Sequence, residues 1–309
     1  MSDGLMDSVA STARPGAAAQ LRANIAICLE LGKWRLSVLV VTTTTVGYAL
    51  AVPPGMAWTR LLYTVVGTAL AALGANALNE WWEVARDERM VRTRRRPLPA
   101  RRLSAPAALA FGLTSGLAGP SLLIGGVGLA PGLLALATLL IYVLVYTPLK
   151  IRSPLNTLIG AVVGAIPPVI GWVAATGQIG IGAWILGGIL FVWQVPHFLA
   201  LAWLHRADYA RGGFLMVPVI DVSGHFTTYL VLLYSLTLLP LTLMLTGVRV
   251  TGWVYAGGAI VLWAGLLAAG VALERQRSTG AARRLFVASV IYLPVLLALM
   301  LLDRAGGEV

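Results

Sequence analysis

The chain has 309 residues, of which 58% are hydrophobic and only 11% are charged. An ordinary soluble domain has about 25% charged residues, so this composition excludes a soluble globular protein, a disordered chain and a nucleic-acid-binding module. The formal net charge of +11 then indicates topology rather than an anionic partner, because basic residues collect on the cytoplasmic side of a membrane.

Nine stretches are apolar enough to cross the hydrocarbon core, which takes about 20 residues of helix. Such long apolar runs predict an all-α bundle of nine transmembrane helices and not the short alternating strands of a membrane barrel. The expected spans are Leu36–Val52, Leu61–Trp82, Ala105–Gly125, Pro131–Pro148, Leu155–Ala175, Gly180–Leu204, Thr227–Gly247, Gly252–Leu273 and Leu285–Leu302. Residues 1–24 are expected to form a disordered cytoplasmic tail, and residues 25–309 a single membrane domain.

The positions of the basic residues support this map. With the N-terminus placed in the cytoplasm, 20 of the 23 Lys and Arg residues fall on the cytoplasmic side, and only Arg60, Arg249 and Arg304 fall outside. One missed or additional span would break this alternation. The sequence therefore predicts a multi-pass protein of the cell's inner (plasma) membrane with a cytoplasmic N-terminus.

Three polar residues extend the second span beyond its apolar part. Asn79, Glu83 and Asp87 recur every four residues, and because each step of four advances a helix by only about 40°, they lie along one face. Oxygen ligands on one face suit Mg²⁺, which prefers one or two carboxylates together with substrate phosphates. The arginines that follow suit the oxygens of a diphosphate. The pattern predicts a clamp for a metal and a diphosphate, whereas Glu80, off this face, is expected to be solvated.

Further polar groups occur in the fifth and sixth spans. The Pro167-Pro168 pair is expected to kink or interrupt the fifth helix and to form a cavity wall. Gln194 and His197 stand one turn apart in the sixth span, where they serve a site or hydrogen-bond a neighbouring helix. Beyond that span, Asp208 reaches the same side of the membrane as the first clamp, so its carboxylate is expected to supply a second metal ligand.

Three stretches carry a resemblance to a known family. NEWWEVARDERMVRTRRRPLP resembles the first motif of the UbiA-type intramembrane prenyltransferases, and more narrowly that of the protohaem IX farnesyltransferase branch, with Asn-x-x-x-Glu-x-x-x-Asp. YTPLKIRSPLNTLIGAVVGAIPPVIGW and WQVPHFLALAWLHRADYARGG match the same branch. Trp34 departs from it, since the family usually has Thr-Lys-Pro-Arg where this chain has Gly-Lys-Trp-Arg. The missing proline affects how the first helix begins and not the chemistry.

The resemblance implies transfer of farnesyl from farnesyl diphosphate to the 2-vinyl group of haem b, with Mg²⁺ as cofactor and addition of water, giving haem O and diphosphate. It implies a first motif that holds Mg²⁺, three basic residues that grip phosphate, a second motif whose aspartate also binds Mg²⁺, and residues that contact haem or line its cavity. In that order, these are Asn79, Glu83 and Asp87; Arg92, Lys150 and Arg206; Asp208 and Tyr209; and Asn156, Gln194 and His197. Membrane lipid surrounds the enzyme, and haem A synthase is a candidate partner.

Two other functions stay open from the sequence. A UbiA-type enzyme acting on a hydroxybenzoate or naphthoate typically carries an Asp-rich first motif, so Glu83 and the Asp208-Tyr209 pair favour the haem branch. A secondary transporter places its sites near the membrane midplane in broken helices. In this chain the ionisable residues gather at the ends of spans, with His197 as the exception.

Overall fold

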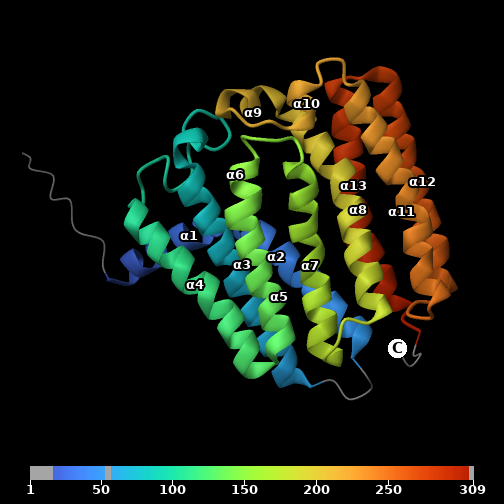
Figure 1. Cartoon of the computed structure of the whole chain (residues 1–309), viewed down its shortest axis with the longest axis horizontal. Helices are drawn as coiled ribbons and strands as arrows, with labels where there is room; N and C mark the ends of the chain where they lie inside the picture. Colours follow the sequence, from blue (N-terminus) through green and yellow to red (C-terminus); the bar gives the residue numbers. More distant parts are fainter. Residues whose placement is uncertain (1–16, 53–56, 306–309) are drawn as a thin grey trace, which may run out of the picture.

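The computed structural model describes residues 17–52 and 57–305. These residues form a bundle of helices (Figure 1). Eight helices within the described ranges are long and apolar enough to cross a membrane. They are α3 (Trp58–Asp87), α4 (Ala105–Gly126), the run Leu129–Leu149, α7 (Asn156–Thr176), α8 (Ile181–Leu204), α11 (His225–Gly247), α12 (Trp253–Gln276) and α13 (Thr279–Leu302). They correspond to eight of the nine expected spans.

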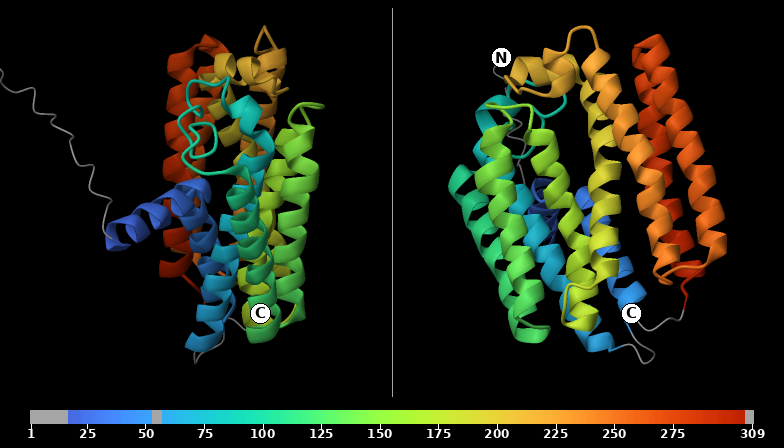
Figure 2. Two further views of the ribbon diagram at one scale, coloured as in Figure 1. Left: turned by 90° about the vertical axis from the view of Figure 1, so that its left-hand side faces the viewer. Right: turned by 45° about the vertical axis from the view of Figure 1, so that its right-hand side comes forward.

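The first expected span corresponds to α2 (Trp34–Ala51), which has 18 residues. Its 18 residues are not apolar enough to count among those eight helices, because they include Arg35 and four consecutive threonines, Thr42–Thr45. The preceding helix α1 (Ala17–Leu31) projects sideways from the bundle (Figure 2). The expected disordered tail over 1–24 is therefore too long, since the chain is helical from Ala17; residues 1–16 lie outside the described part.

Helices α2 and α7 approach each other at the distance of backbone contact. A Cβ added at Gly171 would lie 1.9 Å from the carbonyl oxygen of Thr44, and one added at Gly47 would lie 2.1 Å from that of Pro168. Only glycine fits such a crossing, as in other tightly packed membrane helices. The predicted interruption at Pro167-Pro168 does not occur, because α7 continues through the pair to Thr176.

One end of the bundle is covered by two short helices, α9 (Arg206–Gly212) and α10 (Val217–Ile220), which lie across the top in Figure 1. The loop that leaves α3 reaches the same end. Nearby, the run Leu129–Leu149 changes from α5 (Leu129–Leu140) to a π-helix, η1 (Ile141–Tyr146), and then to α6 (Thr147–Leu149). Short π-helical segments frequently occur at functional sites, and this one borders the pocket described next.

Candidate active site

A polar pocket lies beneath the cap formed by α9 and the neighbouring loop. It is lined by residues from five parts of the chain: the start of α2, the end of α3 and its loop, η1, Lys150, and the segment from α9 to α10. These residues are Lys33, Leu36, Asn79, Glu83, Asp87, Met90, Arg92, Arg96, Tyr142, Tyr146, Lys150, Tyr209, Phe214 and Met216. The pocket thus joins carboxylate, amide, ammonium and guanidinium groups.

The ladder of Asn79, Glu83 and Asp87 lies on one face of α3, as its spacing predicts, and all three side chains line the pocket. They are buried, with exposed fractions of 0%, 4% and 1%. Helix α3 runs for 30 residues, so its last two turns carry these groups beyond the apolar part of the helix. Each ladder residue meets one cation: Lys33 Nζ donates to Asn79 Oδ1 at 2.6 Å, Lys150 Nζ lies 2.8 Å from Glu83 Oε1, and Arg96 donates to Asp87 Oδ2 at 2.7 Å.

The two lysines differ in their electrostatic setting. Burial, together with the positive charges of Arg96 and Lys150, lowers the pKa of Lys33 to about 7, although Glu83 and Asp87 act in the opposite direction. Burial is the largest single effect on Lys150 and lowers its pKa, but the Glu83 carboxylate, Tyr146 and Tyr142 together raise that pKa by more, so Lys150 stays charged. The pocket therefore holds one firmly charged ammonium and one whose charge depends on its neighbours.

The oxygen atoms of the pocket fit a hard divalent cation that is shared with a phosphate. Asp87 Oδ1 is buried and has no hydrogen-bond partner, which leaves it free to bind a cation. Within the described residues, no group of three or more His, Cys, Asp or Glu side chains could hold a metal ion. A metal here would rest on Glu83, Asp87 and the amide oxygen of Asn79, and Mg²⁺ commonly combines one or two carboxylates with substrate phosphates.

Aromatic rings surround the cations of the pocket. Lys150 Nζ lies 4.6 Å from the centre of the Tyr146 ring, and the Arg92 guanidinium lies 5.7 Å from that of Tyr209. Tyr146 in turn stacks on Tyr142, with ring centres 5.2 Å apart. Cations held over ring faces remain charged while they are partly removed from water, which suits a site for an anionic ligand.

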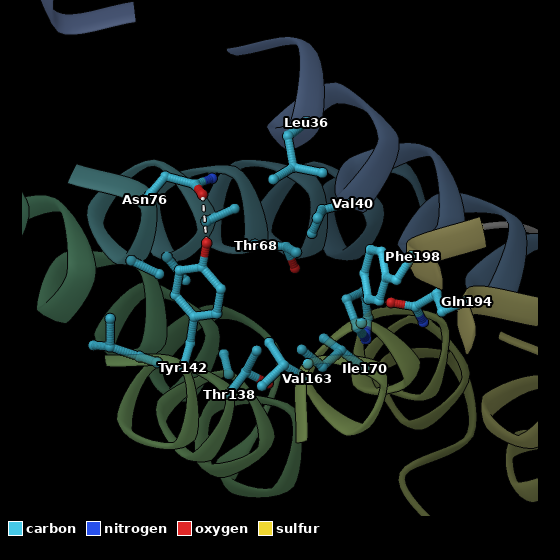
Figure 3. A pocket seen from close by; sticks show the side chains of 18 residues that line it. Leu36, Val40, Thr68, Asn76, Thr138, Tyr142, Val163, Ile170, Gln194 and Phe198 are labelled. Atoms are coloured by element: carbon cyan, nitrogen blue, oxygen red, sulfur yellow. Dashed lines mark hydrogen bonds between the residues drawn. The ribbon is translucent and has the colours of Figure 1, made fainter. Parts of the chain in front are cut away.

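A second chamber, which is apolar, is lined by residues of α2, α3, α5, η1, α7 and α8 (Figure 3). The two cavities share Leu36 and Tyr142. The chamber is partly open, and most of its surface is apolar. Its polar groups include Asn76, which accepts a hydrogen bond from Tyr142 Oη at 3.3 Å, and Thr68, whose buried hydroxyl has no partner. A ligand with an anionic head and a long apolar tail would fill both cavities.

The predicted cavity wall is confirmed in α7, since Pro167 lines the chamber together with Gly160 and Gly164. Gln194 lines it as well, held by hydrogen bonds from its Nε2 to the carbonyl oxygens of Leu190 and Ala161. The structure therefore brings seven of the predicted residues to the two cavities. They are Asn79, Glu83, Asp87, Arg92, Lys150 and Tyr209 in the polar pocket, and Gln194 in the chamber.

Asp208 stands beside the pocket with its carboxylate already bonded. The backbone N–H of Val91 donates to Oδ1 at 3.1 Å, that of Arg92 donates to Oδ2 at 3.4 Å, and Arg211 donates to Oδ1. Burial raises the pKa of Asp208, but these donors together lower that pKa by more, so the net shift is downward. The carboxylate therefore ties α9 to the loop that carries Arg92.

Three other predicted residues lie away from both cavities, namely Arg206, Asn156 and His197. Arg206 packs its guanidinium over the Trp203 ring, 5.8 Å from the ring centre. Asn156 donates to the carbonyl oxygens of Ser153 and Leu215, at 2.7 and 2.9 Å, and so holds the segment that covers the pocket.

His197 packs between α8 and α13. Its ring stacks on Trp193 and on Phe286, with centres 5.0 Å apart in both cases, and its Nδ1 lies 2.8 Å from Ser289 Oγ. Of the two expected roles of His197, the structure thus shows the hydrogen bond to a neighbouring helix, which is α13.

Several residues of the site were not predicted from the sequence. Lys33 and Arg96 face the ladder, although each looks like one more basic residue of a positive-inside cluster; the unusual position of Lys33, directly before an apolar span, was the available signal. Tyr142 lies within an apolar stretch, where nothing in the sequence distinguishes it from a lipid-facing or packed residue. The expectation that Glu80 is solvated is wrong, because its side chain is 0% exposed and accepts a hydrogen bond from the backbone N–H of Leu98 at 3.4 Å.

The chain is similar in sequence and in fold to proteins that are already known. The protoheme IX farnesyltransferase of Solibacter usitatus is 40% identical over 90% of this chain and 98% of its own length. A structure from work on the biosynthesis of digeranylgeranylglyceryl phosphate synthase in membranes matches with a TM-score of 0.73 at 16% identity, covering 90% of this chain and 98% of its own.

A UbiA homologue from Archaeoglobus fulgidus bound to GPP and Mg²⁺ matches with a TM-score of 0.61 at 12% identity, over 89% of this chain and 99% of its own. At these identities, the two structures show a common fold. The sequence profile of the UbiA prenyltransferase family matches residues 40–294. Together with the eight apolar helices, these matches establish that the chain is a multi-pass membrane protein and belongs to the UbiA prenyltransferase family.

Proposed function

We propose that this chain transfers the farnesyl group of farnesyl diphosphate to the 2-vinyl group of haem b, with addition of water, and releases haem O and diphosphate. The observation that carries the proposal is that a cationic pocket and an apolar chamber adjoin and share Leu36 and Tyr142 in their linings. A diphosphate fits the first and an isoprenoid tail the second. The name of the 40%-identical relative supports haem as the acceptor.

We place the reacting carbon of the substrate where the two cavities adjoin, at Leu36 and Tyr142. With the diphosphate among Lys33, Arg92 and Lys150, and the tail along the chamber, the allylic carbon lies near Tyr142. The cations stabilise the negative charge that grows on the leaving diphosphate as its bond to carbon breaks. The vinyl group then forms the new carbon–carbon bond, and water adds to the resulting cation with loss of a proton. The apolar walls keep other water away from these steps.

Bound Mg²⁺ would neutralise phosphate charge and help the diphosphate to leave. We assign its protein ligands to Asn79, Glu83 and Asp87, because their oxygens face the pocket and Asp87 Oδ1 has no other partner. Asp208 is assigned a different task from the one its sequence suggests. Its carboxylate holds the backbone at Val91 and Arg92, and so it positions the loop over the diphosphate.

The membrane setting completes the proposal. The 20-to-3 distribution of basic residues supports a position in the cell's inner (plasma) membrane, with the N-terminus and the polar pocket on the cytoplasmic side. Haem A synthase stays a predicted partner, as the family resemblance implies.

The direct test uses the purified chain in lipid vesicles with haem b, farnesyl diphosphate and Mg²⁺, and detects haem O by mass spectrometry. Asp87→Ala should abolish product, whereas Glu274→Ala, which removes an acidic residue near the end of α12, should leave it unchanged. Prenylation of a hydroxybenzoate in place of haem b would establish the aromatic-acceptor alternative. Full activity of Asp87→Ala would refute the metal clamp.

A further inference from the structure

An asparagine serves as a metal ligand only when its amide oxygen, and not its nitrogen, faces the metal. Asn79 is fully buried, so its orientation is set by the groups packed around it. Lys33 selects the oxygen from the pocket side, since Nζ donates to Asn79 Oδ1 at 2.6 Å. That lysine is also a ligand for the incoming diphosphate, so its contact with Asn79 depends on what the pocket holds. A second contact, on the buried side of Asn79, also fixes the orientation of its amide.

Thr147 meets the amide from the buried side. Asn79 Nδ2 donates to Thr147 Oγ1 at 3.0 Å, and Thr147 Oγ1 donates to the carbonyl oxygen of Tyr142 at 2.8 Å. A threonine hydroxyl has a single proton. Because that proton is used on Tyr142, the hydroxyl oxygen can only accept from Asn79. It therefore faces the NH₂ group, and the amide oxygen must face the pocket.

The π-helix supplies the carbonyl that fixes the direction of this proton. In an α-helix a threonine hydroxyl typically bonds the carbonyl four residues back, as Thr64 does with Arg60. Tyr142 is five residues before Thr147, and its carbonyl oxygen accepts both the backbone N–H and the hydroxyl of Thr147. The wider turn of η1 thus aligns a backbone acceptor, a hydroxyl and the Asn79 amide in one row.

We propose that Thr147 is a positioning residue that fixes the amide of Asn79 with its oxygen toward the divalent cation. The side chain of Thr147 is 2% exposed, and it acts through Asn79 without contacting the substrate. This inference rests on the proposed function of Asn79 as a metal ligand. Hydrogen-bonded groups behind a metal ligand typically change metal affinity by about 10–100-fold when they are removed.

The test measures binding of Mn²⁺ in the presence of inorganic diphosphate by electron paramagnetic resonance, which needs no turnover. Thr147→Val should raise the Kd for Mn²⁺ by about tenfold or more, and Thr147→Ser, which keeps the hydroxyl, should stay within about twofold of the unsubstituted chain. Thr147→Ala removes the hydroxyl without a new methyl group and should behave like Thr147→Val. Thr64→Val is the matched control, because it removes a buried hydroxyl remote from the pocket.

A variant with two oxygen atoms at residue 79 tests the orientation of the amide directly. In an Asn79→Asp background both terminal atoms are oxygens, so either orientation presents a ligand, and adding Thr147→Val should change the Kd by less than about threefold. An unchanged Kd in Thr147→Val and Thr147→Ala, or an equal loss in the Asn79→Asp background, would overturn the assignment. If the unsubstituted chain bound no Mn²⁺, the metal clamp itself would fall, and the role of Thr147 with it.

Discussion

The two possible roles of Asp208 predict different results for Asp208→Asn. As a metal ligand, its loss would raise the concentration of Mg²⁺ needed for half-maximal activity. As the anchor of the loop that carries Arg92, its loss would weaken binding of farnesyl diphosphate and leave the Mg²⁺ requirement unchanged. The structure favours the second result, because both carboxylate oxygens already accept hydrogen bonds from that loop.

The size of the effect follows from the contacts. Asparagine keeps one oxygen, for the N–H of Val91 or of Arg92, and places an NH₂ group against the other. A hydrogen bond to a charged group contributes about 1.5–3 kcal/mol, and the 12% exposure of the side chain lets water recover part of it. A net loss of about 1–2 kcal/mol corresponds to a factor of about 5–30, which we expect as an increase in KM for farnesyl diphosphate.

Steady-state kinetics on the reconstituted chain, with farnesyl diphosphate and Mg²⁺ varied in turn, separates the two roles. Asp303→Asn is the matched control, because Asp303 Oδ2 also accepts a backbone N–H, from Tyr255 at 2.7 Å, but lies at the opposite end of the bundle. Its KM for farnesyl diphosphate should not change. An increased Mg²⁺ requirement for Asp208→Asn with an unchanged KM would refute the loop anchor and restore the metal role.

Three other substitutions test separate parts of the structure. Lys33→Met should raise the KM for farnesyl diphosphate at least about tenfold, because it removes an ammonium that meets the diphosphate. It should not lower the Tm, because a buried ammonium is costly to remove from water. A constant KM would remove Lys33 from the site. His197→Ala should lower the Tm through its lost stacking and hydrogen bond, about 1–2 kcal/mol, yet leave KM for haem b unaltered, and a weaker affinity for haem would support the haem contact predicted from the sequence. Gly171→Ala should destabilise the fold by about 1–3 kcal/mol in thermal unfolding, whereas Gly257→Ala, where a Cβ meets nothing within 4 Å, should not, and equal Tm values for the two would contradict the α2–α7 backbone contact.

The sequence predicts best where one helix carries the whole signal. Asn79, Glu83 and Asp87 lie on one continuous helix, so their spacing alone fixes their common face. Arg206 and Asp208 show the limit of such reasoning. Two residues apart on a short helix, they point in different directions, and only the packing of α9 decides that Asp208 meets the loop while Arg206 meets Trp203.

Contacts between distant segments were beyond the sequence for the same reason. Lys33 has a left-handed backbone conformation, with φ of 50°, and this conformation begins α2 in the chain that lacks the family's usual proline. Its approach to Asn79, 46 residues away, depends on how α2 packs against α3. In α8, Gln194 and Phe198 share a face that reaches the chamber, while His197 is turned by about 100° from Phe198 and faces α13.

The backbone contact between α2 and α7 has a consequence for how large ligands enter. Where Gly47 and Gly171 bring two main chains together, no side chain lies between them that could rotate and open a gap. We therefore expect these two helices to move together as one wall of the chamber. We expect a flat macrocyclic acceptor to enter between other helices, so the distance between labels on α2 and α7 should not change while the enzyme takes up its acceptor.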